Sequence, residues 1–261
     1  MKKGIILSLA GFDPTGSAGI LADIKVFSLF GLKGAGVPTT LTLQNTSIFE
    51  KWDPVDSYYL KRALELLFSD LPVLGIKIGM IGTLQNIKII AEIIKRERKK
   101  ISWIILDPVL TATLNFPLFS SDGFLEALKN EIFPYLDIIT PNVKEAEVLT
   151  QKEIKNKLHL FEIAKELLSY GIKAVIIKGW ERKYFIWDFF YSSKGDYIFL
   201  KKKKIQGTFH GTGCVFSSAL LSYLVKGYEP QIAFKKAKNW VYLNLKKVLQ
   251  ERIGGRIWLF L

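Results

Sequence analysis

Short apolar runs alternate with amphipathic segments along almost the whole chain, and this alternation constrains the fold more than any other feature of the sequence. Residues 5–9, 73–78 and 103–106 are such runs, and turn-forming or polar residues follow each of them. The segment at 87–94, between two of these runs, carries its apolar residues at helical spacing. Apolar strands that are separated by helices are typical of a parallel sheet covered on both sides. The sequence therefore predicts the α/β class.

The remaining segments extend the same pattern and predict one domain. Further strands are expected at residues 34–46, 137–139 and 174–177. Further helices are expected at residues 20–30, 56–68, 124–132, 144–149, 160–168 and 215–226, and from Pro230 onward. Aromatic residues on both sides of Gly195-Asp196 predict an antiparallel hairpin at 185–200. Because no repeat or linker interrupts the pattern, residues 1–261 are expected to form a single domain.

The chain is strongly basic, with a formal net charge of +13 over 261 residues. Such a charge is compatible with binding to nucleic acid, to an anionic membrane surface or to a phosphorylated ligand. The basic clusters at 95–100 and 201–204 carry no interleaved aromatic residues and no nucleic-acid-binding motif, so we interpret them as solvated surface. A single cysteine cannot form an internal disulfide bond, and no apolar run approaches membrane-spanning length. These observations predict a cytoplasmic protein that binds neither nucleic acid nor membranes.

A glycine-spaced turn at residues 208–214, with the sequence TFHGTGC, precedes a small and apolar helical segment. The first N–H groups of a helix have no partner within it, and together with the helix dipole they favour an anion such as phosphate. Cys214 would lie in the first turn of this helix, a position that lowers the pKa of a thiol and favours the thiolate. The turn by itself is equally compatible with a tight bend in front of a buried cysteine.

Polar residues and glycines follow the ends of most predicted strands. In open α/β sheets, ligands bind outside the carboxyl ends of the strands. The residues gathered there are Gly11, Asp13, Gln44, Asn45, Gly79, Met80, Asp107, Asn142 and Lys178. Oxygen atoms of Asp107, Asn142 and Glu145 suit Mg²⁺, and Lys178 supplies a positive charge, as phosphoryl transfer requires. The sequence has neither the P-loop pattern nor the protein-kinase motif set.

Seven motifs together resemble those of one known family. In chain order they are GFDPTGSAGILAD at 11–23, TLQNT at 42–46, KIGM at 77–80, DPV at 107–109, TPN with EAE at 140–147, KG at 178–179 and HGTGC at 210–214. On these motifs the chain resembles the hydroxymethylpyrimidine/phosphomethylpyrimidine kinases of thiamine biosynthesis, which belong to the ribokinase-like superfamily. The resemblance covers nearly the whole chain, and the combination is far more specific than any single motif.

The resemblance implies a fold, a reaction and a set of site residues. The fold would be a three-layer α/β/α sandwich around a mainly parallel sheet. A homodimeric enzyme would use ATP and Mg²⁺ to phosphorylate 4-amino-5-hydroxymethyl-2-methylpyrimidine and then its monophosphate to the diphosphate. The substrate would be bound by Gly11, Asp23, Gln44, Met80 and Val109. ATP would be bound by Asn142, Lys178, Thr208 and Thr212, magnesium by Asp107 and Glu145, and the anion hole would be formed by Gly211, Gly213 and Cys214.

Two roles for Cys214 stay open under this resemblance. Its thiolate could be the base that takes the proton of the substrate hydroxyl, at the position where most ribokinase-like enzymes carry an aspartate. Alternatively, Cys214 could act mainly through its backbone N–H in the anion hole. His210 is expected to shape the turn through a side-chain hydrogen bond. The sequence departs from the family pattern at residues 110–115, Trp180 and Phe209, which leaves open a lid over the substrate and a contact of Trp180 with the nucleotide.

Three other functions compete with this interpretation. A pyridoxal or pyridoxine kinase would have the same fold, but the run 44–46 and Met80 favour the pyrimidine. A basic nucleic-acid-binding protein would explain the net charge, but the lysines are scattered. A catalytically inactive ligand sensor would be expected to lack some of Asp107, Glu145 and Cys214, all of which are present.

Overall fold

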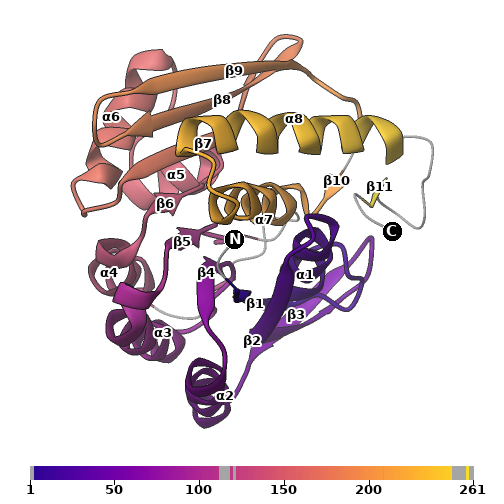
Figure 1. Cartoon of the computed structure of the whole chain (residues 1–261). Coiled ribbons are helices and arrows are strands. Elements are labelled where there is room, and N and C mark those ends of the chain that lie inside the picture. The colour runs from indigo at the N-terminus through magenta and orange to yellow at the C-terminus, as the bar shows by residue number, and fades with distance from the viewer. Residues whose placement is uncertain (1–2, 112–117, 120–121, 208, 249–256, 259–261) are drawn as a thin grey trace.

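A nine-stranded sheet forms the centre of the protein (Figure 1). The computed structural model describes residues 3–111, 118–119, 122–207, 209–248 and 257–258. The strands follow the order β3-β2-β1-β4-β5-β6-β7-β8-β9, and those from β2 to β7 in this order run parallel. Their bounds are β1 (Ile5–Phe12), β2 (Lys33–Gln44), β3 (Phe49–Pro54), β4 (Val73–Ile78), β5 (Trp103–Leu106), β6 (Ile138–Ile139), β7 (Ala174–Arg182), β8 (Phe185–Ser192) and β9 (Tyr197–Lys203).

Helices cover both faces of this sheet and complete a three-layer α/β/α sandwich. One face packs against α1 (Gly19–Leu29), α7 (Thr212–Val225) and α8 (Pro230–Val248). The other face packs against α2 (Ser57–Asp70), α3 (Leu84–Glu97), α4 (Phe124–Ala127), α5 (Val143–Thr150) and α6 (Lys157–Leu168). Short helical turns η1 (Arg98–Lys100), η2 (Leu128–Ile132) and η3 (Phe133–Tyr135) continue two of these helices. Among the described residues, every helix is too short or too polar to span a bilayer.

The two halves of the hydrophobic core meet the sheet through alternate residues of its central strands. In β5, Ile104 packs into the cluster under α2 to α6, whereas its neighbour Ile105 packs into the cluster under α1, α7 and α8. In β7, Ile177 and Ile176 divide in the same way. Successive side chains of a strand point to opposite faces, so a strand covered on both faces must be apolar at every position. This requirement explains why the central strands are uninterrupted apolar runs.

The predicted architecture is confirmed in its centre and differs at its margins. The antiparallel hairpin is present as β8 and β9. Strand β3 was not predicted, because its sequence FEKWDP is polar and lies along the exposed edge of the sheet, where it pairs antiparallel with β2. The single helix expected at 124–132 is a short α4 that widens into the π-helical turn η2. A second small sheet pairs β10 (Phe209–His210) with β11 (Ile257–Trp258).

Trp180, one of the departures from the family pattern, belongs to the hydrophobic core. Its ring is buried in the cluster under α2 to α6. The guanidinium of Arg182 lies 4.3 Å from the centroid of this ring and covers it from outside. The structure therefore gives Trp180 a packing role at the end of β7 and no support for the contact with the nucleotide that the sequence left open.

Candidate active site

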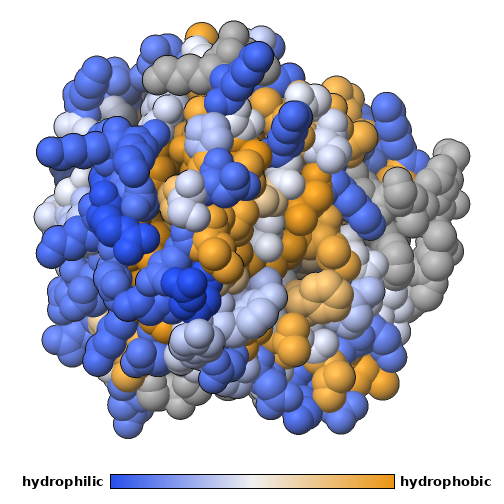
Figure 2. Space-filling model, turned by 60° about the horizontal axis from the view of Figure 1, so that its bottom comes forward, coloured by the Kyte–Doolittle hydropathy of each residue, from blue (hydrophilic) through white to orange (hydrophobic). Residues whose placement is uncertain are grey.

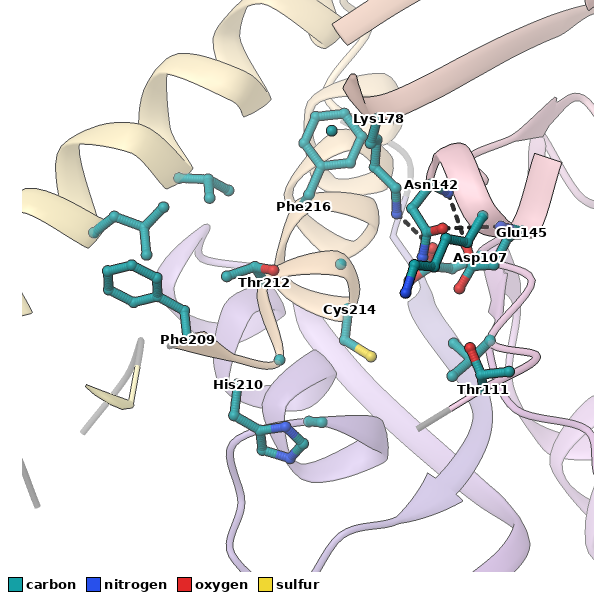
Figure 3. A pocket seen from close by; sticks show the side chains of 18 of the residues that line it. Asp107, Thr111, Asn142, Glu145, Lys178, Phe209, His210, Thr212, Cys214 and Phe216 are labelled. Atoms are coloured by element: carbon teal, nitrogen blue, oxygen red, sulfur yellow. Dashed lines mark hydrogen bonds and ion pairs between the residues drawn. The ribbon is translucent and has the colours of Figure 1, made fainter. Parts of the chain in front are cut away.

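One large cavity of about 580 Å³ opens at the carboxyl ends of the parallel strands (Figure 3). Its walls come from the ends of β1, β2, β4, β5 and β7, from the beginnings of α5 and α7, and from β9 and α8. Twelve of the fourteen residues predicted from the sequence line it: Gly11, Gln44, Met80, Val109, Asp107, Asn142, Glu145, Lys178, Gly211, Thr212, Gly213 and Cys214. The other two are Asp23, which is described below, and Thr208, which lies outside the described residues.

The N-terminus of α7 points into the middle of this cavity. Gly211 precedes the helix with a φ of +80°, which L side chains rarely adopt. A Cβ atom at Gly211 would lie 1.7 Å from the carbonyl oxygen of Ser17. The turn can therefore approach the β1–α1 loop only as glycine. The first residues of α7 are Thr212, Gly213 and Cys214, whose N–H groups have no partner within the helix and are available to an anion.

A buried ion pair lies directly beside the first turn of α7. Lys178 Nζ, from β7, donates a hydrogen bond to Asp107 Oδ1 at 2.7 Å, and Thr140 Oγ1 donates to the same oxygen at 3.1 Å. Burial alone would raise the pKa of Asp107, but the charges of Lys178 and Lys77 hold it below its usual range. A Cβ on Gly213 would lie 3.4 Å from both Asp107 Oδ2 and Lys178 Nζ, so the first turn of the helix lies in van der Waals contact with the ion pair.

Asn142 and Glu145 are bound to each other across the first turn of α5. Asn142 Oδ1 accepts a hydrogen bond from the Glu145 N–H at 2.9 Å, and the Asn142 N–H donates to Glu145 Oε2 at 2.8 Å. This capping box explains why the sequence around Asn142 begins a helix. Burial raises the pKa of Glu145 to about 8, with a further contribution from Asp107 and partial compensation by Lys178.

Mg²⁺ fits the donor chemistry at this end of the cavity. The described residues contain no group of three or more His, Cys, Asp or Glu side chains that could hold a metal ion on their own. Mg²⁺ does not need one, because it commonly takes one or two carboxylates and completes its shell with phosphate oxygens and water. Asp107 and Glu145 both line the cavity and provide such a pair of carboxyl groups.

The thiol of Cys214 has a high pKa, which corrects the expectation of a stabilised thiolate. Figure 3 shows its side chain leaving the first turn of α7 toward the cavity. Burial raises the pKa of this thiol to about 11, and the nearby charges of Asp23 and Asp107 add to the effect. The charge of Lys77 and the backbone N–H of Gly19 lower the pKa only in part. The lowering of the thiol pKa expected from the helix N-terminus is thus outweighed by burial and by the two carboxylates. Cys214 is therefore a neutral thiol near pH 7.

The end of the cavity formed by β1 and β2 combines apolar side chains with one amide. Met80, Val109, Leu118 and Phe49 provide the apolar lining. Gln44 Nε2 donates a hydrogen bond to Thr42 Oγ1 at 3.0 Å, which orients the amide. Thr42 and Phe49 also line the cavity and were not predicted as site residues: Thr42 was noted only as part of the motif at 42–46, and Phe49 belongs to the unpredicted β3.

Asp23 does not line the cavity, and its predicted contact with the substrate has no support in the geometry. Its carboxylate is fully buried. It accepts hydrogen bonds from Lys77 Nζ at 2.8 Å, from Ser8 Oγ at 2.6 Å and from Ser218 Oγ at 2.7 Å. With its oxygens occupied in this way, Asp23 is part of the support of the site and has no surface to offer a ligand.

His210 shapes the loop before α7, in the role expected from the sequence. Its Nε2 lies 3.1 Å from Asp13 Oδ2, which joins two segments far apart in the chain. Burial opposes ionisation of Asp13, but His210 and Thr15 hold the pKa of this carboxyl below its usual value. Asp13 also accepts a hydrogen bond from the Ala18 N–H at 3.0 Å, so it organises the β1–α1 loop against which Gly211 packs.

The opposite end of the cavity is rich in lysines, partly balanced by carboxylates of the lining, and no pattern in the sequence indicated that these lysines reach the cavity. Lys202, Lys203 and Lys204, interpreted above as solvated surface, line this end. Tyr242 and Leu245 of α8 lie there as well, and Lys202 Nζ is 5.2 Å from the centroid of the Tyr242 ring. The lysines reach the cavity because the hairpin β8–β9 extends beside α8 (Figure 1), a tertiary relation that no local pattern encodes.

The chain is similar to known proteins over nearly its full length. Residues 13–255 match the family model described as Phosphomethylpyrimidine kinase. A hydroxymethylpyrimidine/phosphomethylpyrimidine kinase of Aquifex aeolicus (strain VF5) is 40% identical over 245 residues, which cover 93% of this chain and 94% of the relative. The crystal structure of phosphomethylpyrimidine kinase from Clostridium difficile 630 is similar with a TM-score of 0.80 at 32% identity, covering 93% of this chain and 100% of the other. An ADP complex of Bacillus subtilis pyridoxal kinase has a TM-score of 0.83 at 27% identity, covering 94% and 93%.

Replacement of Gly211 tests whether the close approach at the N-terminus of α7 is needed for function. We expect Gly211→Ala to lower kcat roughly 100-fold, because the loop must move away from Ser17 by an ångström or more. Gly227→Ala is the matched control, since Gly227 follows the same helix with a φ of +92° but has no atom within 4 Å of its Cβ position. Steady-state kinetics and thermal unfolding of both variants separate an effect on catalysis from an effect on stability. Equal kcat values for the two variants would show that the contact is not required.

Proposed function

We propose that the cavity described above is the place where this enzyme transfers phosphoryl groups to its substrates. The chain belongs to the phosphomethylpyrimidine kinase family, and it phosphorylates hydroxymethylpyrimidine and its monophosphate in thiamine biosynthesis. The observation that carries this proposal is the position of the first turn of α7. It lies between an apolar end of the cavity that suits a pyrimidine ring and a basic end that suits a nucleotide.

The pyrimidine would bind at the end formed by β1 and β2. Met80 and Val109 offer apolar contacts to the faces of a ring, and the Gln44 amide can both donate and accept hydrogen bonds at its edge. Gly11 keeps this end open, because a Cβ there would lie 2.8 Å from Thr40 Oγ1 and 3.3 Å from the Met80 sulfur. The hydroxymethyl group of a ring held in this way would point toward α7.

ATP would bind at the basic end with its terminal phosphate at α7. Lys202 and Lys203 can pair with phosphate oxygens, and Tyr242 and Leu245 offer apolar contacts to the base. The N–H groups of the first turn of α7 and the Lys178 ammonium would receive the transferring phosphoryl group. Asp107 and Glu145 would hold Mg²⁺, which supplies positive charge to the phosphate oxygens when it is bound.

Cys214 would contribute mainly through its backbone N–H. Phosphoryl transfer through a loose transition state places most of its demand on positioning and charge stabilisation, and little on removal of the acceptor proton. A thiol with a pKa of about 11 is ionised only to a small fraction near pH 7, so it is a scarce base. Its N–H, in contrast, is held at the helix N-terminus at every pH.

A serine substitution distinguishes the two roles of Cys214, because it keeps the N–H group and removes the thiol. We expect Cys214→Ser to keep kcat within about tenfold of the wild type between pH 7 and 9, a difference of roughly 1.4 kcal/mol in activation free energy. If the thiolate were the base, wild-type kcat would instead rise about tenfold per pH unit below the thiol pKa, and the serine variant would lose this dependence together with most of its activity. Rates measured across this pH range in both proteins decide between the roles.

The substrate is tested by assaying ATP consumption with three acceptors in parallel. We expect turnover with hydroxymethylpyrimidine and with its monophosphate, and a kcat/KM for pyridoxal at least tenfold lower, because the Gln44 amide faces the apolar end where the pyrimidine edge would lie. Addition of EDTA should abolish turnover, and Mg²⁺ should restore it. Pyridoxal as the preferred acceptor would assign the chain to the second function considered above, which the pyridoxal kinase neighbour makes the relevant alternative.

We further propose that the enzyme is a homodimer assembled through the edge formed by β2 and β3. Thr42 and Gln44 line the cavity, whereas Leu41 and Leu43 between them face the opposite side and are 51% and 50% exposed. Ile48, in the turn to β3, is 60% exposed. Figure 2 shows how hydrophobic patches interrupt the hydrophilic surface on one face of the molecule. Apolar side chains concentrated on one strand face in this way are typical of an interface between subunits.

Lysine substitutions on this strand test the dimer. We expect the wild type to be dimeric at micromolar concentration and the double variant Leu41→Lys/Leu43→Lys to be monomeric, because the interface would have to bury two charges. Leu158→Lys on α6 is the control, since Leu158 is 64% exposed and α6 packs against β7 and β8, at the other end of the sheet. Light scattering after size-exclusion chromatography gives the masses. A monomeric wild type, or a double variant that stays dimeric, would rule out this interface.

A further inference from the structure

Four polar side chains form a closed cluster behind the first turn of α7, outside the cavity. Asp23 of α1 is its centre, and it accepts hydrogen bonds from Ser8 of β1, from Lys77 of β4 and from Ser218 of α7. The donor–acceptor distances lie between 2.6 and 2.8 Å, and all four residues are fully buried. None of the four belongs to the lining of the cavity, so the mechanism above makes no direct use of them.

Burying this cluster costs desolvation free energy, and its hydrogen bonds compensate for only part of it. A buried carboxylate and a buried ammonium are both expensive to desolvate, and such a pair adds little net stability compared with apolar residues of the same size. Burial would lower the pKa of Lys77, but the charge of Asp23 raises it above its usual value, so the Lys77 ammonium stays ionised. A network of this kind is favourable only when every member is satisfied, and then it specifies one geometry.

Helix α7 needs such a specification, because most of its packing contacts are apolar. Its residues from Val215 to Ser222 are all buried, on every side of the helix. The hydrophobic effect is not directional, so apolar burial alone defines the rotation of the helix about its own axis less sharply than hydrogen bonds do. The hydrogen bonds of two consecutive serines define this rotation. Ser217 Oγ lies 3.2 Å from Asp107 Oδ2, and Ser218 Oγ donates to Asp23 Oδ1 at 2.7 Å.

We propose that Asp23, acting through Ser218, is a positioning residue that sets the orientation of the first turn of α7 and thereby aims its N–H groups at the transferring phosphoryl group. Ser218 lies one helical turn, about 6 Å, beyond Cys214. A change in rotation at Ser218 is transmitted to the N-terminus because the helix is rigid over so short a distance. The inference rests on the proposed anion-binding role of this turn.

The experiment compares two serine-to-alanine substitutions on the same helix. Ser218→Ala removes the bond to Asp23 and leaves the Lys77–Asp23 ion pair and the Ser8 bond intact, so the protein is expected to fold. Ser222→Ala is the matched control, because Ser222 is equally buried and donates only to the backbone carbonyl of Ser218 within the helix, at 2.8 Å. We expect Ser218→Ala to lower kcat roughly tenfold or more with KM values little changed, since misaimed donors lose most in the transition state. Ser222→Ala should leave kcat unchanged.

A second readout does not depend on catalysis. Cys214 is the only cysteine of the chain, so the rate of its alkylation by iodoacetamide reports on the first turn of α7 without substrate. We expect this rate to increase several-fold in Ser218→Ala and to stay at the wild-type value in Ser222→Ala. Equal behaviour of the two variants in both measurements, whatever their melting temperatures, would overturn the inference. A wild type that turns over no pyrimidine, with the alkylation difference still present, would instead refute the proposed function and leave the positioning role standing.

Discussion

The structure depends on charged side chains that are buried beside the N-terminus of α7, the helix that begins at the centre of the cavity. Two ion pairs, Asp107–Lys178 and Asp23–Lys77, lie close to the first turn of α7, and each carboxylate neutralises one lysine. Without this balance, the buried lysines or the buried carboxylates would each cost several kcal/mol. Because the two pairs cancel, the partial positive charge of the helix end remains available to an anion. The apolar layers around the sheet exclude water from the Asp23–Lys77 pair, which is fully buried, and strengthen it.

The sequence predicted the parts of the fold and of the site that local patterns encode. Apolar strands, their polar carboxyl ends and the glycine-spaced turn all leave a signal within a few residues, and twelve predicted residues meet in one cavity for that reason. The family motifs then connected these signals to a phosphoryl-transfer enzyme, in agreement with the family to which the chain belongs. The polar edge strand β3 left no such signal, because exposed strands need no apolar face.

Other properties of the site depend on distant parts of the chain and could not be predicted from local patterns. The pKa of Cys214 follows from burial and from Asp23 and Asp107, which lie far away in the sequence. The position of Cys214 in a first helical turn, taken alone, predicted a lowered thiol pKa instead. Asp23 matches a family motif, yet its carboxylate is turned toward Lys77 and away from the cavity. Residue type and spacing locate a group near a site, whereas the direction of its side chain is decided by its partners.

The lysine-bearing hairpin at one end of the cavity has a consequence for how ligands arrive. The molecule carries a formal net charge of +13, and Lys202 and Lys203 concentrate part of it at the mouth where a nucleotide would enter, whereas Lys204 is paired there with Glu181. A field of one sign at a concave opening raises the local concentration of oppositely charged solutes and guides their diffusion. At physiological salt this guidance extends about 8 Å from the surface. The rate of capture of polyanions is therefore set partly by ionic strength, before any contact inside the cavity is made.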